Sequence, residues 1–329
     1  MSELHSVAAQ MVAKGKGILA ADESIPTCTK RFESINTESN EQSRNFYRNM
    51  LFTSDNIAEY INGIILFDET FYQKELKTDT LFPQYLESKN ILPGIKVDGG
   101  LQSFNNHPEE KVTVGLDRLD KKLSRYYSLG ARFAKWRSVI TLGNGIPSDG
   151  CIQANAEGLA KYALLCQQAN LVPIVEPEVL MDGNHTIDIS FDVTDRTLSA
   201  VFSQLEKHNV DLQGIVLKPN MVLSGYNCEN QASVEEVAQK TLECLTNNVP
   251  SSVPGIAFLS GGQSDELATL HLNEMNKQDT NWKVTFSYGR ALQQNALNTW
   301  AGKSENVKAA QEALLSRAKA NSLATTASL

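Results

Sequence analysis

The 329-residue sequence lacks the features that mark several large classes of protein. Its five cysteines are odd in number and widely spaced, with no CxxC pair, which argues against a disulfide framework or a cysteine-bound zinc site. It has no basic excess, because 30 lysines and arginines stand against 38 aspartates and glutamates, a formal net charge of −8. Nucleic acid and anionic membranes are therefore not the expected partners. No apolar run approaches the roughly 18 residues that span a bilayer.

Targeting and metal-binding signals are missing as well. The first residues, MSELHSVAAQMVAKGKG, contain no basic segment followed by an apolar run, so no signal peptide is predicted. Unpaired thiols without a leader indicate a cytoplasmic protein. The histidines are expected in helices or loops and form no HxH or HExxH motif, and they are His5, His107, His185, His208 and His271. We therefore expect no metal and no cofactor.

Short apolar runs rich in β-branched residues recur along the chain, separated by segments with helical periodicity. Each run is followed by enough residues for a helix and two loops, which a parallel strand needs to return beside its neighbour. Strands that are apolar on both faces are also typical of parallel sheets covered by helices. Eight such runs predict a (β/α)₈ TIM barrel rather than a doubly wound sheet. They end at or contain Asp22, Phe67, Asp98, Lys135, Glu176, Lys218, Ser260 and Ser287.

No linker divides the chain, because it has no low-complexity stretch, charge block or Gly/Ser hinge. We therefore expect a single domain over residues 1–329. Apolar stripes with helical spacing are clear at residues 41–52, 115–131 and 155–171. The segment NSLATTASL, residues 321–329, is small and polar and is expected to be a flexible C-terminal tail.

Charged residues fall where the predicted strands end. In a barrel these ends form the active face, so a charged residue that closes an apolar strand is a candidate catalytic group. Lys135 and Arg137 alternate along one strand and so share a face, as do Glu176 and Glu178 on the next. Equivalent positions on other strands are occupied by Asp22, Lys96, Lys218 and Arg290. Each residue alone could form a loop salt bridge, but their coincidence at so many strand ends favours an active site.

Lys218 lies in the run Gly-Ile-Val-Leu-Lys-Pro. A lysine that is desolvated beside another cation favours its neutral amine and becomes a nucleophile toward a carbonyl. Lys135 could supply the second cation, and Glu176 or Glu178 could transfer the protons that Schiff-base formation requires. An internal ion pair between Lys218 and Glu176 without a catalytic role is the alternative.

Two groups of residues are suited to bind phosphate. The sequences SGGQS and SYGR follow the seventh and eighth predicted strands, where barrel enzymes often hold a phosphate on backbone amides. Arg290, in SYGR, adds a bidentate partner for phosphate oxygens. The second group comprises Ser24, Thr27, Lys30, Arg31 and Lys96. Two anion sites at one barrel mouth predict a substrate phosphorylated at both ends, although Lys30 and Arg31 could instead mark an exposed helix start.

The motifs GKGILAADES, GIKVD, FAKWR, VPIVEPE, LKPNM, FLSGGQS and FSYGRALQ, in this order, closely resemble class I fructose-1,6-bisphosphate aldolase. The similarity runs from Val12 to about Leu323. It implies a (β/α)₈ barrel, assembled as a homotetramer, that works without metal in glycolysis and gluconeogenesis. The implied reaction is the reversible cleavage of fructose 1,6-bisphosphate into dihydroxyacetone phosphate and glyceraldehyde 3-phosphate, and the implied partners are small sugar phosphates.

The resemblance also implies roles for the candidate residues. Lys218 stands where the family has its Schiff-base lysine, and Glu176, with Glu178 as its neighbour, matches the acid/base residue. Asp22 matches the aspartate near the C4 hydroxyl, and Lys135, with Arg137 on the same strand, matches the lysine that assists Schiff-base chemistry. The C1 phosphate site corresponds to Ser260, Gly261, Gly262, Ser287, Gly289 and Arg290. The C6 phosphate site corresponds to Ser24, Arg31 and Lys96, with Lys30 alongside.

The sequence departs from the family's pattern in two places. Many relatives have a smaller, glycine-bearing stretch where this chain has residues 25–29, in which Pro26 lacks a backbone donor. Many also have a longer tail with a terminal tyrosine that reaches the active site, whereas this sequence has no tyrosine beyond Tyr288. Proton exchange at C3 would then depend on Glu176, Glu178 or water.

Two rival functions stay open at this point. One is a different barrel lyase or isomerase for a sugar phosphate, and the other is a catalytically silent binding or scaffold protein, because a fold alone does not prove activity.

Overall fold

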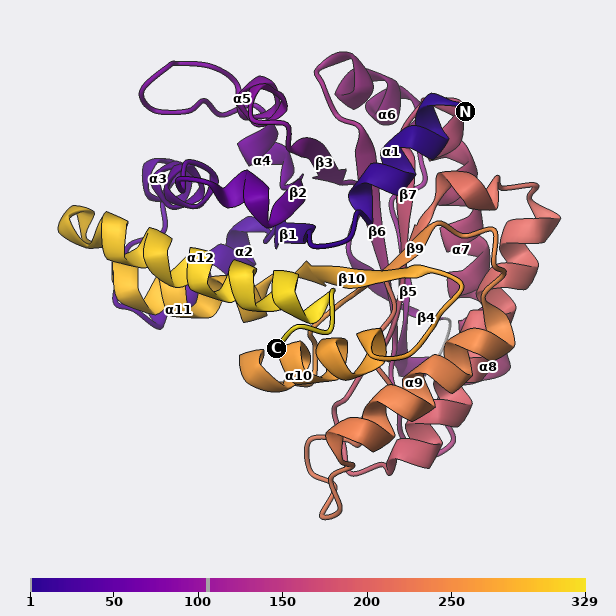
Figure 1. Cartoon of the computed structure of the whole chain (residues 1–329). Helices are drawn as coiled ribbons and strands as arrows, with labels where there is room; N and C mark the ends of the chain where they lie inside the picture. Colours follow the sequence, from indigo (N-terminus) through magenta and orange to yellow (C-terminus); the bar gives the residue numbers. More distant parts are fainter. Residues whose placement is uncertain (1, 105–106) are drawn as a thin grey trace.

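The computed structural model describes residues 2–104 and 107–329, and its core is a closed barrel of parallel strands (Figure 1). The barrel strands are β1 (Gly17–Ala21), β2 (Ile61–Leu66), β3 (Leu92–Lys96), β6 (Phe133–Ile140), β7 (Val172–Val179), β8 (Val216–Leu217), β9 (Gly255–Phe258) and β10 (Lys283–Tyr288). They follow one another around the barrel in chain order, and β10 closes it by pairing with β1. The predicted (β/α)₈ barrel is therefore confirmed.

Helices connect the strands and surround the barrel (Figure 1). They are α1 (Glu3–Met11), α2 (Ile25–Glu33), α3 (Glu41–Phe52), α4 (Asp68–Phe71), α5 (Phe82–Ser88), α6 (Leu119–Ser128), α7 (Asp149–Gln168), α8 (Ile187–Lys207), α9 (Val234–Asn248), α10 (Asp265–Asn276), α11 (Arg290–Trp300) and α12 (Val307–Ala324). The helix predicted over residues 41–52 is confirmed as α3, and the other two predicted stretches contain α6 and most of α7. Four long helices, α7 to α10, each begin after a Ser or Thr whose side-chain oxygen accepts a hydrogen bond from the backbone N–H three residues later. This contact caps the N-terminus of the helix.

Two apolar layers hold the barrel together. The smaller one fills its interior and includes Phe133, and the larger one lies between the strands and the helices. Gly94 makes room for Phe133, because a Cβ there would lie 2.2 Å from the ring. Ala8 and Met11 of α1 join the interior layer, and the side chain of Asn62, at the start of β2, donates to the Gln10 carbonyl at 2.6 Å. Helix α1 therefore closes the end of the barrel at which the strands begin, and the opposite end carries the site.

An antiparallel hairpin between β3 and α6 was not predicted. Its strands are β4 (Leu101–Phe104) and β5 (His107–Thr113). The sequence gives no alternating apolar pattern here, because most of the hairpin is exposed and packs on the rim of the barrel. The prediction that every histidine lies in a helix or loop is wrong for His107, which begins β5. Buried Glu110 of β5 accepts hydrogen bonds from the backbone N–H (2.6 Å) and hydroxyl of Ser148, and so ties the hairpin to the start of α7.

The C-terminal segment also differs from the predicted flexible tail. Helix α12 continues to Ala324, and Asn321 is fully buried, accepting a hydrogen bond from the Thr269 hydroxyl at 2.9 Å. The Thr325 hydroxyl accepts from the Gly15 backbone at 2.9 Å. Small polar residues resemble a linker in sequence, but here their hydrogen-bond partners come from distant parts of the chain.

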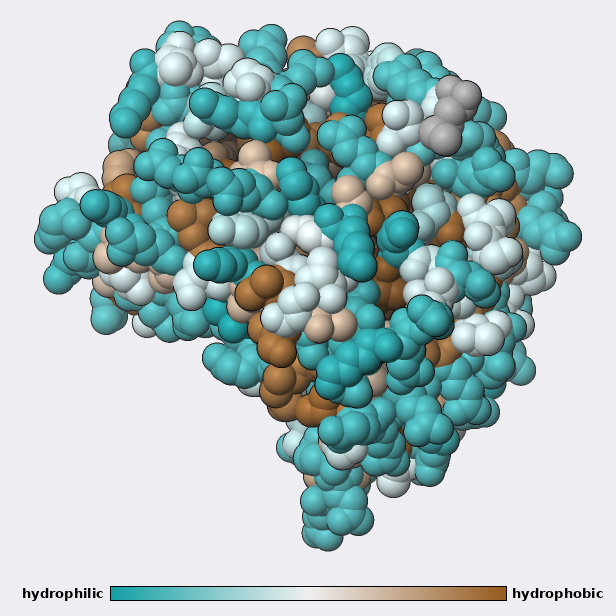
Figure 2. All heavy atoms as spheres, viewed as in Figure 1, coloured by the Kyte–Doolittle hydropathy of each residue, from teal (hydrophilic) through white to brown (hydrophobic). Residues whose placement is uncertain are grey.

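No helix of the described residues is long and apolar enough to cross a membrane. Figure 2 shows a mainly hydrophilic face on which hydrophobic residues gather around α10 and the C-terminal end. The exposed leucines of these segments are Leu267, Leu270, Leu323 and Leu329.

Candidate active site

The ends of the barrel strands surround a cavity of about 510 Å³. Almost every residue predicted for the site lines it: Asp22, Ser24, Arg31, Lys96, Lys135, Arg137, Glu176, Glu178, Lys218, Ser260, Gly261, Gly262, Ser287, Gly289 and Arg290. Lys30 does not: it is exposed on α2 and is not among the described residues that line the cavity, so the structure does not bring it to the predicted site. The ends of the barrel strands thus bring residues from all parts of the chain to one cavity.

Lys218 lines the cavity and directly follows β8. Its side chain is buried, and its Nζ lies 3.2 Å from Oε1 of Glu176. The other oxygen of Glu176, Oε2, lies 3.1 Å from Nζ of Lys135, which also lies 3.0 Å from Oδ2 of Asp22. The four groups therefore form a chain of alternating charge in which Lys135 bridges two carboxylates and Glu176 bridges two lysines.

The two lysines differ in their electrostatic environment. Burial lowers the pKa of Lys218, and the positive charge of Lys135 adds to the lowering, so that Glu176 and Asp22 only partly offset it. For Lys135, burial also favours the neutral form, but Asp22 and Glu176 outweigh it and raise the pKa. Burial would raise the pKa of Asp22, yet Lys135 and Lys218 together lower it to about 2. Lys218 is thus the lysine closer to a free amine, while Lys135 stays a cation beside an ionised Asp22.

Glu178 lies two residues beyond Glu176 on β7 and faces the same cavity, as predicted. Its Oε2 accepts a hydrogen bond from Nε of Arg137, which follows Lys135 by two residues on β6. The two strands thus contribute two ion pairs, one deep in the cavity and one nearer its rim. The Arg137 side chain is 39% exposed, so this outer pair is in contact with solvent.

The loops after β9 and β10 form the first candidate phosphate site. Gly262 has a φ of +81°, and a Cβ there would lie 2.2 Å from Cγ of Met181, so this turn requires glycine. The Ser287 hydroxyl is buried and has no hydrogen-bond partner among the described residues. Arg290 opens α11 directly after Gly289, which adds the partial positive charge of a helix N-terminus. Unpaired donors and positive charge at one corner are suited to an anion.

The start of α2 and the end of β3 form the second candidate phosphate site. Ser24 precedes α2, and its hydroxyl lies 3.1 Å from that of Thr27. Pro26 lies in the first turn of the helix, where a missing N–H removes no helical hydrogen bond. Lys96 ends β3 and lines the same cavity, with its Nζ 3.3 Å from Oδ1 of Asp98. Arg31, one turn further along α2, is paired with Glu23.

Sequence reasoning missed three acidic residues of the cavity, Glu23, Asp98 and Asp182. Glu23 and Asp98 belong to motifs that were recognised, because Glu23 follows Asp22 in AADES and Asp98 closes GIKVD. Each is the partner of a predicted phosphate-binding cation, Arg31 and Lys96 respectively. The signal that could have found them is the placement of a carboxylate next to a cation at a strand end.

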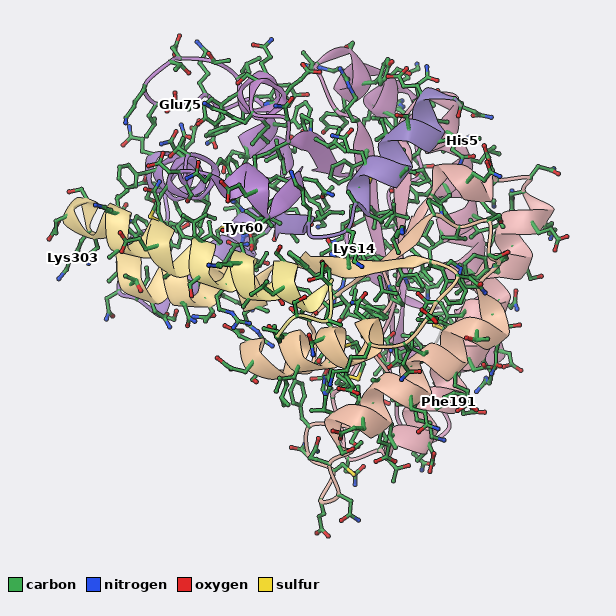
Figure 3. The ribbon with its side chains drawn as sticks, in the orientation of Figure 1. His5, Lys14, Tyr60, Glu75, Phe191 and Lys303 are labelled. Atoms are coloured by element: carbon green, nitrogen blue, oxygen red, sulfur yellow. The ribbon has the colours of Figure 1, made fainter. Side chains whose placement is uncertain are left out.

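Among residues 2–104 and 107–329, no group of three or more His, Cys, Asp or Glu residues is arranged to hold a metal ion. His5, labelled in Figure 3, lies on α1, and its Nε2 is 2.5 Å from Oδ2 of Asp211, remote from the cavity. The described cavity offers cations and isolated carboxylates, a set suited to anionic organic substrates.

A model of glycolytic class I fructose-bisphosphate aldolases matches residues 3–329. The chain belongs to this family. The class I aldolase is a carbon–carbon lyase that reversibly cleaves fructose 1,6-bisphosphate into dihydroxyacetone phosphate and glyceraldehyde 3-phosphate. Membership of the family decides against the two rival functions, a different barrel lyase or isomerase and a silent binding protein.

Relatives with about half of their residues identical carry the same name. A "Probable fructose-bisphosphate aldolase class 1" of Xanthomonas axonopodis pv. citri (strain 306) is 51% identical over 326 residues, which cover 98% of this chain and 97% of that protein. The "Fructose-bisphosphate aldolase 4, cytosolic" of Arabidopsis thaliana is 50% identical over 325 residues, which cover 98% and 82%. The two relatives thus differ in how much sequence lies outside the shared aldolase region.

The fold of the chain also closely matches that of a solved aldolase. The structure of fructose-bisphosphate aldolase from Plasmodium falciparum, in complex with TRAP and a small molecule inhibitor, matches with a TM-score of 0.97 and 48% sequence identity. The match covers 99% of this chain and 94% of that chain. The barrel of the aldolase described here is therefore shared over nearly its full length.

Proposed function

We propose that this aldolase cleaves its substrate through a Schiff base on Lys218. The observation that carries the proposal is the position of Lys218: it is buried, its pKa is lowered, and an acid/base group, Glu176, lies 3.2 Å from its Nζ. A neutral amine attacks the C2 carbonyl of the ketose and forms a carbinolamine. Glu176, which accepts the proton that the Lys218 ammonium loses before the attack, returns it to the departing hydroxyl, so that water leaves and an iminium links C2 to Nζ of Lys218.

The iminium is the electron sink for the cleavage. Asp22 accepts the proton of the C4 hydroxyl, the C3–C4 bond breaks, and glyceraldehyde 3-phosphate leaves as the aldehyde. The bonding electrons pass into an enamine between C3, C2 and Nζ of Lys218. Protonation at C3 regenerates the iminium, and water returns to release dihydroxyacetone phosphate. The position of Lys135, 3.0 Å from Asp22 and 3.1 Å from Glu176, keeps both carboxylates oriented toward this centre.

The two anion sites account for the two phosphates of the substrate. Ser260, Gly261, Gly262, Ser287, Gly289 and Arg290 would bind the C1 phosphate, and Ser24, Arg31 and Lys96 the C6 phosphate. The unpaired hydroxyl of Ser287 and the glycine backbone at Gly262 support the first assignment. The second group lines the same cavity from β3 and the start of α2, which supports the second assignment. Binding at both ends places C2 over Lys218 and the C3–C4 bond near Asp22.

Replacement of Lys218 tests the proposal. Lys218→Met should abolish cleavage of fructose 1,6-bisphosphate while the thermal unfolding temperature changes little, because methionine fills a similar volume and introduces no unpaired charge. Lys96→Met is a matched control that also removes one cavity lysine, and it should lose affinity but not turnover. Substantial turnover by Lys218→Met would refute the Schiff base at this residue.

We also propose that the chain is one folding domain that assembles as a homotetramer in the cytoplasm. The family resemblance supports the tetramer, and exposed leucines around α10 provide apolar surface for contacts between chains. Free cysteines, four of them buried, are typical of a reducing compartment, and one relative is named a cytosolic aldolase. Light scattering coupled to size-exclusion chromatography tests the assembly; a monomer at micromolar concentration would refute it.

A further inference from the structure

Glu23 is held from two sides by two arginines. Its side chain is 7% exposed and lies at the wall of the cavity. Oε1 pairs with Nη1 of Arg31, and Oε2 pairs with Nη2 of Arg48 at 2.9 Å. Arg31 lines the cavity, whereas Arg48 is not among the described residues that line it.

Arg48 is one of the most deeply buried charged groups of the protein. It lies on α3, and its side chain is 1% exposed. The same Nη2 that pairs with Glu23 also donates to the Glu23 carbonyl at 3.1 Å, and Nη1 donates to the Thr70 hydroxyl at 3.3 Å. Contacts to both the backbone and the carboxylate of Glu23 fix the direction of that side chain.

The count of charges explains why two arginines are useful. A buried carboxylate paired with a single arginine would form a neutral pair, and that arginine would have to leave its partner uncompensated in order to bind a phosphate. With two arginines around one carboxylate, the group keeps a net positive charge. We propose that Arg48 is a positioning residue for the C6 phosphate site. It compensates the negative charge of Glu23 from outside the cavity, so that Arg31 is available to bind phosphate.

A glutamine on α11 completes the same network. Nε2 of Gln293 donates to the Ala20 carbonyl at 2.7 Å and to Oε1 of Glu23 at 2.8 Å, and its Oε1 accepts from the Tyr47 hydroxyl at 3.1 Å. Because a backbone carbonyl can only accept, the orientation of this buried amide is determined. Gln293 lies one turn after Arg290, so the helix that begins at the first phosphate site also supports Glu23 at the second.

The proposal rests on the assignment of Arg31 to the C6 phosphate, and substrates with and without that phosphate test it. For Arg48→Met we expect the KM for fructose 1,6-bisphosphate to rise by about 10- to 100-fold, the loss that follows when a charge-assisted contact is removed. The KM for fructose 1-phosphate and both kcat values should change by less than about threefold. Arg48→Lys, which keeps the charge but not the paired contacts, should be intermediate.

Arg44→Met is the matched control. Arg44 is one turn before Arg48 on the same helix, is also buried, and pairs with Glu69 instead of a cavity residue. Its replacement should cost similar stability without changing the ratio of the two KM values. The double variant Arg31→Ala/Arg48→Met should bind the bisphosphate no more weakly than Arg31→Ala alone, because Arg48 acts through Arg31.

The outcomes separate the assignment of Arg31 to the C6 phosphate from the role of Arg48. If Arg31→Ala weakens both substrates equally, the assignment of Arg31 is wrong. If Arg31→Ala is selective but Arg48→Met affects both substrates, or adds its full effect to that of Arg31→Ala, the role of Arg48 is refuted. If Arg48→Met does not fold by circular dichroism, Arg48→Lys and Gln293→Met decide by the same ratio, and an unchanged ratio in both refutes the proposal.

Discussion

The replacement Lys135→Met shows how the two lysines of the cavity depend on each other. Lys135 and Lys218 lie 3.1 and 3.2 Å from the two oxygens of one carboxylate, Glu176. Without Lys135, Lys218 loses a neighbouring positive charge. The negative charges of Glu176 and Asp22 also act more strongly on Lys218, because Lys135 no longer pairs with them. Both changes favour the ammonium form, so the pKa of Lys218 should rise.

The size of the rise follows from the usual effect of one neighbouring charge. A single charge within about 4–6 Å shifts a pKa by on the order of one to three units, and each unit corresponds to about 1.4 kcal/mol. At a fixed pH below this pKa, the fraction of free amine should fall about 10- to 1000-fold. The variant should therefore recover activity as the pH rises, by about tenfold per pH unit until the new pKa is reached.

The assay is the rate of borohydride-trapped adduct formation with dihydroxyacetone phosphate between pH 6 and 10. Lys135→Arg is the control, because it keeps the positive charge and should leave the acidic limb of the profile in place. An acidic limb that does not move in Lys135→Met, with only a lower plateau, would refute the electrostatic role of Lys135 and leave it a role in proton transfer or binding alone.

Three further predictions concern binding, metal and the C-terminal segment. Arg290→Ala should lower kcat/KM for fructose 1-phosphate and fructose 1,6-bisphosphate alike, by about 30-fold, because an exposed arginine is partly screened by solvent. Arg31→Ala and Lys96→Ala should lower kcat/KM only for the bisphosphate. Steady-state kinetics with both ketoses measure these changes. Dialysis against EDTA should leave the cleavage rate unchanged, and a loss restored by zinc would contradict the mechanism. Deletion of residues 325–329 should lower the unfolding temperature in calorimetry by a few degrees, because it removes the Thr325 contact to Gly15, but should leave kcat within about twofold.

The residues at the strand ends were predictable from two regularities of the sequence: the alternation of side chains along a strand and the regular spacing between strands. Residues two apart on a strand share a face, which placed Lys135 with Arg137 and Glu176 with Glu178. The barrel's regular crossover length then brought these strands beside Lys218, far away in sequence. The physical rule needs only apolar runs, spacing and alternation, all of which are visible in the sequence.

The parts that were missed depend on contacts that have no periodicity. The hairpin at residues 101–113 is mostly exposed and gives no apolar alternation. Asn321 and Thr325 are ordered by single hydrogen bonds to residues distant in the chain. Lys30 and Arg31 are adjacent in sequence, and only the rotation of α2 decides which of them faces the cavity.

The covalent role of Lys218 is tested most directly by reduction with borohydride in the presence of dihydroxyacetone phosphate, followed by peptide mapping. The mechanism predicts one stable adduct, on the peptide that contains Lys218, and no adduct in Lys218→Met. A stable adduct on Lys135 or Lys96 instead, in protein that carries Lys218, would contradict it.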